Sequence, residues 1–97
     1  MRIIARRTLR EFYGLHADAK GPLEAWFHEA ADADWGGPQE VKQRYPSADI
    51  LPGHRVVFNI KGNTYRLIVK IHYNTGIVYI RFIGTHAEYD KVDATTI

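Results

Sequence analysis

Hydrophobic and polar residues alternate with a period of two in the second half of the chain. Three runs rich in Val, Ile, Tyr and Phe are separated there by turn residues, which predicts strands that bury one face. We expect these strands at Arg55–Ile60, Thr64–Tyr73 and Ile77–Gly84. Gly62-Asn63 and Thr75-Gly76 suit two-residue hairpin loops, so the strands are predicted to form an antiparallel sheet.

The first half of the chain has a helical pattern instead. Arg2–Arg6 predicts a short strand, and a Thr-x-x-Glu capping box predicts a helix that begins at Thr8. A second helix is expected to start between Asp18 and Pro22, because apolar residues then recur at i, i+3, i+4 and i+7. Pro38 suits the first position of a third short helix or a turn. The pattern predicts an α+β fold, with two or three helices packed on one face of a small antiparallel sheet.

Length and composition narrow the class of protein. Ninety-seven residues are enough for one domain, which we expect to span residues 1–97. The chain contains no cysteine, which excludes disulfides, thiol catalysis and thiolate metal sites. No segment has the pattern of a signal peptide or the ~20 apolar residues of a membrane span, so a cytosolic, cytoplasmic protein is expected.

The hairpin loops determine which residues face each other across the predicted sheet. The expected pairs on one face are all apolar: Ile60–Tyr65, Phe58–Leu67, Val56–Val69, Tyr73–Val78, Ile71–Ile80 and Val69–Phe82. This face is therefore expected to pack on the helices. A slip of one residue would bring Arg81 into the core, which constrains the register.

The opposite face carries polar side chains. The same register groups them as a row of Arg55, Lys70 and Arg81, a row of Asn59, Arg66 and Thr85, and the pair of His72 and Tyr79. Neighbouring strands lie ~4.8 Å apart, and like charges directly opposite each other destabilise a sheet. No carboxylate occurs between Asp49 and Glu88 to offset the repulsion between these cations. We interpret the face as a site for a polyanion. The alternative is an ordinary basic surface, on which the side chains spread into solvent or are covered by Glu88 or Asp90.

A second capping box, from Thr85 to Glu88, predicts a short helix after the last strand. This helix would place His86 in its first turn, with Tyr89 on the same side. A histidine and a tyrosine beside cations suit proton transfer, and the simpler alternative is that His86 is only a helix-end residue. The expected position of His86 next to two arginines of the sheet favours the functional interpretation.

Two segments of the chain resemble the HigB family of bacterial toxins, within the RelE-like group of messenger-RNA interferases. Residues 57–69 carry F-N-x-x-G-N-x-x-R, and residues 78–91 carry Y-I-R and T-H-x-E-Y-D, in the family's order and spacing. The resemblance extends over residues 1–93, and the helical half matches in layout more than in motif. It implies a RelE-like α+β fold.

The resemblance also implies a function and a set of partners. It implies an endoribonuclease that cuts mRNA, often on the translating ribosome, and a HigA-like helix-turn-helix antitoxin that silences it. The family's motif positions correspond here to the expected catalytic residues, Arg66, Arg81, His86 and Tyr89. The residues expected to bind RNA from the sheet register alone are Arg55, Lys70, His72 and Tyr79. No cofactor or metal is expected, because the basic face offers no carboxylates for Mg²⁺.

RNA cleavage without a metal needs a base for the 2′-hydroxyl, cations for the crowded phosphate and an acid for the leaving 5′-oxygen. We expect Arg66 and Arg81 to hold the scissile phosphate, with Lys70 assisting. His86 or Tyr89 would transfer the protons. Two alternatives remain open: a toxin of the same fold that inhibits a protein target such as gyrase, and an RNA-binding module for which the basic face suffices.

Overall fold

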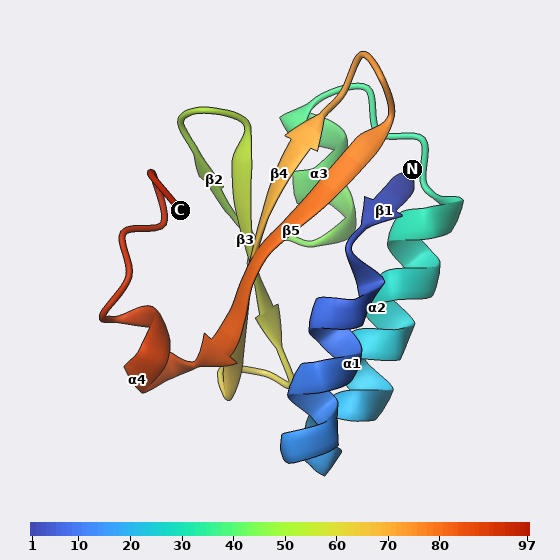
Figure 1. The fold of residues 1–97 in the computed structure, drawn as a ribbon. Helices are drawn as coiled ribbons and strands as arrows, with labels where there is room; N and C mark the ends of the chain where they lie inside the picture. Colours follow the sequence, from blue (N-terminus) through green and yellow to red (C-terminus); the bar gives the residue numbers. More distant parts are fainter.

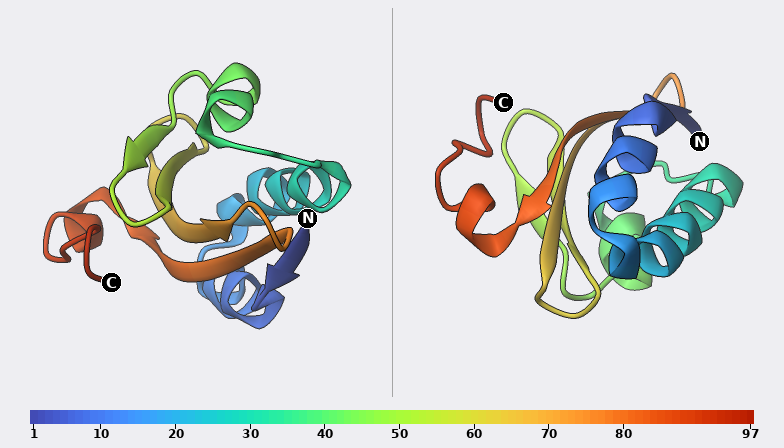
Figure 2. Two further views of the ribbon diagram at one scale, coloured as in Figure 1. Left: turned by 90° about the horizontal axis from the view of Figure 1, so that it is seen from above. Right: turned by 60° about the horizontal axis from the view of Figure 1, so that its bottom comes forward.

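Five strands form one sheet, and helices lie against both of its faces. The computed structural model describes residues 1–97 in full. The elements in chain order are β1 (Arg2–Ile4), α1 (Arg6–Leu15), the 3₁₀ turn η1 (Ala17–Ala19), α2 (Lys20–Asp32), α3 (Pro38–Arg44), β2 (Asp49–Leu51), β3 (Arg55–Ile60), β4 (Tyr65–His72), β5 (Ile77–Thr85) and α4 (His86–Tyr89). The strand order is β1-β5-β4-β3-β2, in which only β1 and β5 are parallel. Helices α1 and α2 lie on one side of the sheet and α4 on the other (Figure 1, Figure 2), which confirms the predicted α+β fold.

Of the three α-helices in the first half of the chain, two begin where the sequence pattern predicts. Helix α2 begins at Lys20 and α3 at Pro38, as predicted. Helix α1 begins directly after Ala5, which has an extended backbone and forms no side-chain cap. The backbone N–H of Thr8 donates to the Ala5 carbonyl (3.1 Å) inside the first turn. The predicted start at Thr8 is therefore wrong, because β1 ends at Ile4 and leaves a single residue before the helix.

The face of the sheet that packs on α1, α2 and α3, here called the inner face, is lined by apolar and aromatic side chains. The β3–β4 pairs Val56–Val69, Phe58–Leu67 and Ile60–Tyr65 have the predicted register and belong to one buried cluster with residues of the helices. Phe58 is 1% exposed, and its ring meets those of Trp26, Trp35 and Tyr45 at centroid distances of 5.4, 6.4 and 5.0 Å. No polar or charged side chain is buried in this core.

The hairpin between β4 and β5 differs from the prediction. A two-residue loop at Thr75-Gly76 was expected, but His72 faces Ile77 and the loop contains residues 73–76. The N–H groups of Thr75 and Gly76 both donate to the His72 carbonyl, and Gly76 adopts the left-handed φ of 71° that glycine tolerates. The first half of β5 is therefore shifted by two residues, which leaves its faces unchanged. The observed pairs are Ile71–Val78 and Val69–Ile80.

A β-bulge at Arg81 reverses the faces in the second half of β5. Ile80 faces Val69 and Phe82 faces Ile68, so Arg81 is an extra, unpaired residue. Phe82 consequently lies on the face away from α1–α3, and its predicted place opposite Val69 in the core is wrong. Both sides of this strand end are covered, because α4 contacts β5 from the other face. The sequence is apolar on both sides there, and a period-two count alone does not reveal the bulge.

One strand of the sheet was not predicted. Residues 49–51 form β2, which pairs antiparallel with β3 so that Asp49 faces Val57 and Leu51 faces Arg55. This short edge strand brings a carboxylate next to the basic strands. None of the helices has the length and apolar composition that a membrane span requires.

Candidate functional site

The face of the sheet opposite α1–α3, here called the outer face, has an apolar centre and two polar ends. Val57 and Ile68 are fully buried there, although they do not belong to the helix-side core. Helix α4 lies at the lower end of this face in Figure 1, next to the start of β4, and the β4–β5 hairpin lies at the upper end. Arg66 is therefore at the lower end, whereas Lys70 and His72 are at the upper end.

Arg66 is a largely enclosed cation. Its side chain is 12% exposed, and one terminal nitrogen (Nη2) lies 3.1 Å from Oδ2 of Asp49. The other terminal nitrogen donates to the side-chain oxygen of Asn59, and Nε is buried without a partner. Asp49 and Asn59 therefore fix the orientation of the guanidinium group, while some of its five N–H donors remain available.

Helix α4 has the predicted capping box. The Thr85 hydroxyl accepts from the Glu88 N–H (3.2 Å), and the Glu88 carboxylate accepts from the Thr85 N–H (2.8 Å). These hydrogen bonds hold the pKa of Glu88 below its usual range. Thr85 faces Tyr65, and Gly84 takes the place predicted for Thr85 opposite Arg66. Thr85 and Glu88 thus have the structural role that the sequence indicated.

The cap brings Tyr89 to Arg66 and His86 next to Tyr89. The centroid of the Tyr89 ring lies 4.5 Å from Cζ of Arg66, a cation–π contact. The His86 ring lies 6.4 Å from that of Tyr89, and Nε2 of His86 lies 3.4 Å from the side-chain oxygen of Asn63 in the β3–β4 loop. The structure therefore gathers three of the four predicted catalytic residues, Arg66, His86 and Tyr89, at one end of the outer face. We call these three residues with Asp49 and Asn59 the Arg66 cluster.

The predicted row of three cations is wrong in one member. Lys70 faces Arg55 on β3 as predicted, but on β5 it faces Tyr79 rather than Arg81. The bulge removes Arg81 from the row and leaves it exposed, with no ion pair. Nε of Arg55 donates to the Ile97 carbonyl at 3.0 Å. The cations are thus less crowded than the sequence suggested.

The remaining predicted RNA-binding residues lie together at the upper end of the outer face. The rings of His72 and Tyr79 meet edge to face at 5.1 Å, which confirms that the two are neighbours, and Tyr79 faces Lys70. Lys70 follows Arg66 by four residues on the same strand, a separation of about 13 Å. The outer face therefore carries two separate groups of predicted site residues.

The carboxylate that pairs with Arg66 was not predicted from the sequence. Asp49 marked only the start of an interval without carboxylates, because a three-residue strand gives almost no periodic signal. The apolar pair Ile50-Leu51 before Pro52-Gly53 was the available signal, since a turn between two apolar runs is typical of a hairpin.

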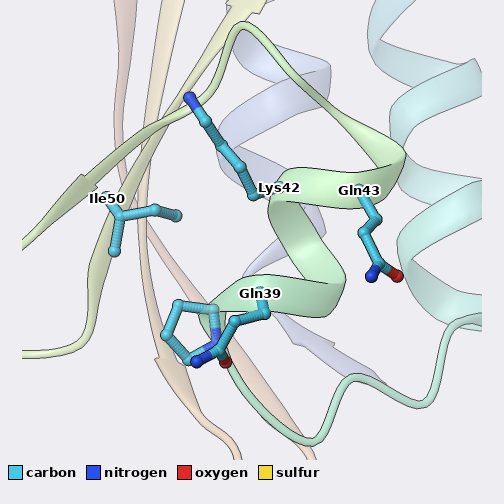
Figure 3. Close-up of a pocket in the computed structure, with 5 residues that line it drawn as sticks. Gln39, Lys42, Gln43 and Ile50 are labelled. Atoms are coloured by element: carbon cyan, nitrogen blue, oxygen red, sulfur yellow. The ribbon is translucent and has the colours of Figure 1, made fainter.

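A further pocket lies between α3 and β2, lined by Gln39, Lys42, Gln43 and Ile50 (Figure 3). Nζ of Lys42 donates to the Ala48 carbonyl at 2.6 Å, so the only charge at this pocket is engaged by backbone. None of the predicted site residues lines it. Nowhere in the chain do three or more His, Asp or Glu side chains gather in a way that could hold a metal ion.

The fold and the Arg66 cluster together define a class: a small α+β protein of RelE-like layout with a cationic and aromatic outer face. Residues 19–92 match the family model described as HigB_toxin, RelE-like toxic component of a toxin-antitoxin system. The chain is 30% identical over 93 residues to the mRNA interferase toxin HigB of Escherichia coli (strain K12), which covers 93% of this chain and 88% of that protein. It is 24% identical over 94 residues to the mRNA interferase HigB of Escherichia coli O6:H1 (strain CFT073), with 95% and 91% covered. The chain therefore belongs to the HigB family of RelE-like toxins.

Proposed function

We propose that this chain is a metal-independent endoribonuclease that cleaves mRNA, and that it is the toxin of a toxin–antitoxin pair. The observation that carries the proposal is the Arg66 cluster, in which the Arg66 guanidinium lies over the Tyr89 ring and the His86 imidazole lies next to that ring. The relatives named mRNA interferase HigB support it.

In this proposal Arg66 stabilises the negative charge that develops on the scissile phosphate. A preorganised donor is effective because it needs no reorganisation during the reaction, and Asp49 and Asn59 hold the Arg66 guanidinium in place. Arg81 supplies a second cation from the neighbouring strand, where the bulge leaves it exposed and unpaired.

His86 and Tyr89 are proposed to carry out the two proton transfers of the reaction, one as the base and the other as the acid. The 2′-oxygen attacks the phosphorus atom and gives up its proton to one of them, while the P–O5′ bond breaks. The 5′-oxygen takes a proton from the other. The products are a 2′,3′-cyclic phosphate and a 5′-hydroxyl, so no metal or further reactant is needed.

Residues at the upper end of the outer face are proposed to bind the flanking RNA. Lys70 would contact a phosphate, and the rings of His72 and Tyr79 would contact bases. Arg55 uses Nε for its hydrogen bond to Ile97, and its terminal nitrogens would contact the backbone of the RNA.

The finer parts of the proposal concern the setting of the reaction. We propose that cleavage is coupled to translation on the ribosome, and that the antitoxin has a helix-turn-helix domain and resembles HigA. The family description supports an antitoxin partner, and the basic outer face would suit contact with ribosomal RNA.

The proposal is tested by inducing the chain briefly in a bacterial host and mapping new mRNA 5′ ends. His86→Ala and Arg81→Ala are compared with wild type, and His28→Ala, an exposed histidine of α2, is the matched control. New ends that appear with wild type and with the control but vanish in both variants are the expected result. A parallel assay on a purified transcript, with and without ribosomes, tests the coupling to translation. Growth arrest with intact mRNA would overturn the nuclease and point to a protein target.

A further inference from the structure

A recess of about 360 Å³ lies at the upper end of the outer face, and three of its five lining residues, His54, Tyr73 and Asn74, have no role in the mechanism proposed above. Its lining consists of His54, Lys70, His72, Tyr73 and Asn74. The volume falls within the ~300–1,000 Å³ range of sites that hold small ligands or parts of larger ones. The lining contains a cation, two imidazoles, a phenol and an amide, but no carboxylate, so it suits an anionic ligand with hydrogen-bonding groups.

His54 reaches this recess through an unusual backbone conformation. Its φ of 63° lies in the left-handed region, which a residue other than glycine rarely adopts. The Ile71 N–H donates to the His54 carbonyl at 2.8 Å, which ties the β2–β3 loop to β4. The His54 ring then lies 6.2 Å from the Tyr73 ring. Residues held in such conformations cluster at ligand-binding sites, and here the conformation adds a second ring to the recess.

The composition of the recess favours RNA over an acidic peptide. Unpaired bases stack on His and Tyr rings and are hydrogen-bonded along their edges, which an amide such as that of Asn74 can do. An acidic peptide would use the ammonium group of Lys70 but would have no use for the ring surfaces of His54, His72 and Tyr73.

Strand β4 connects the recess to the Arg66 cluster. It runs without a break from Tyr65 to His72, and Lys70 lies about 13 Å from Arg66 along it. We propose that the recess is a second RNA subsite, which binds nucleotides a short distance along the strand from the scissile phosphate. The inference rests on the proposed function in so far as one RNA molecule occupies both places.

The test measures binding, so that it does not depend on cleavage. Random-sequence 2′-O-methyl RNA pools, which lack the attacking hydroxyl, are used in a length that fills only the Arg66 cluster and in lengths extended on the 5′ or the 3′ side. The ratio of long-pool to short-pool affinity is compared for wild type, His54→Asn and the control His28→Asn. Asn tolerates the left-handed backbone of position 54 but lacks the ring.

The expected result is that one of the two extensions increases the affinity of wild type and of the control. His54→Asn reduces this long-to-short ratio about tenfold, the size expected for one lost base-stacking contact. Lys70→Gln should lower the slope of log affinity against log salt by about 0.7 for the long pool, as expected for one lost phosphate contact on a single strand.

Two results would overturn the second subsite without contradicting the proposal that the chain is a nuclease. The first is an unchanged affinity ratio in His54→Asn together with cleavage by wild type. The second is an unchanged ratio together with a weakened complex between His54→Asn and the antitoxin, which would assign the recess to a protein partner. Conversely, the affinity ratio could fall in His54→Asn although the wild-type chain cleaves no RNA. This result would support the second subsite and contradict the proposed nuclease activity.

Discussion

The two faces of the sheet differ in the kinds of side chain that they bury. The inner face buries apolar and aromatic side chains against three helices, and one buried donor there, Nε1 of Trp26, has no hydrogen-bond partner. The outer face also has an apolar centre, but it encloses the Arg66 guanidinium and leaves its Nε without a partner. An unpaired buried donor lowers stability. Each face thus buries one unpaired donor, but only the donor on the outer face belongs to a charged group, which costs more to bury. The inner face therefore provides most of the stability of the molecule, whereas the outer face gives up some stability to hold a cation in a fixed place.

Replacing the centre of the inner face tests the first half of this comparison. Phe58→Ala should lower the free energy of unfolding by about 3–5 kcal/mol, because a large ring is removed from a packed site. Phe82→Ala on the outer face should lower it less, because Phe82 is only partly buried. Urea unfolding of both variants measures the difference, and equal losses would contradict it.

Replacing the cation of the outer face tests the second half. Arg66→Lys keeps the charge but loses the planar fork that contacts Asp49 and Asn59. Cleavage should fall by about 10²–10³-fold, the usual loss when one preorganised donor is removed from a site. Transcript cleavage and the unfolding midpoint are measured together. Arg44→Lys, in an exposed pair with Glu29, is the matched control, and a fully active Arg66→Lys would remove Arg66 from the mechanism.

The cap of α4 links the fold to the outer face. Thr85→Ala should weaken α4 by about 1 kcal/mol, the usual effect of losing a helix cap, and should release Tyr89 from Arg66. Amide exchange in residues 86–89 should accelerate, with cleavage reduced severalfold. Thr85→Ser should restore both, because a serine hydroxyl also caps the helix. Unchanged amide exchange in Thr85→Ala would show that the cap does not hold α4 in place.

The smallest effect is expected from a polar contact at the rim of the inner face. Lys61 and the Tyr65 hydroxyl both donate to Asp18, and these hydrogen bonds, that of Lys61 first, hold the pKa of Asp18 below its usual range. The unfolded chain has the ordinary pKa of ~3.9, so this stabilisation is complete above that pH and is lost as the pH falls through the lower folded value.

The stability difference between wild type and Asp18→Asn should therefore shrink as the solution is acidified. The effect is small, because both partners of the Lys61–Asp18 pair are about half exposed. Urea unfolding at neutral and at acidic pH measures it. A difference that stays constant over this range would assign no stability to the charge of Asp18.

The sequence predicted those parts of the fold that depend on local pattern. The β3–β4 register follows from alternation around one hairpin, and the cap of α4 follows from Thr85 and Glu88. The pairing of Arg66 with Asp49 depends on a strand of three residues, which is too short to show a period. The position of Arg81 depends on a bulge between apolar residues, where either face can be buried. Contacts between distant segments therefore had to come from the structure.

The bulge at Arg81 has a consequence for the length of the β4–β5 hairpin. The bulge changes which residues of β5 face each side of the sheet. Before Arg81, Val78 and Ile80 face the inner side, and after it Phe82 faces the side on which α4 lies. Deletion of Arg81 would remove the bulge and leave the faces of β5 unchanged, because Ile80 and Phe82 already pair with the consecutive residues Val69 and Ile68. We expect sequence alignments of related chains to need a one-residue gap at this strand wherever the bulge is absent.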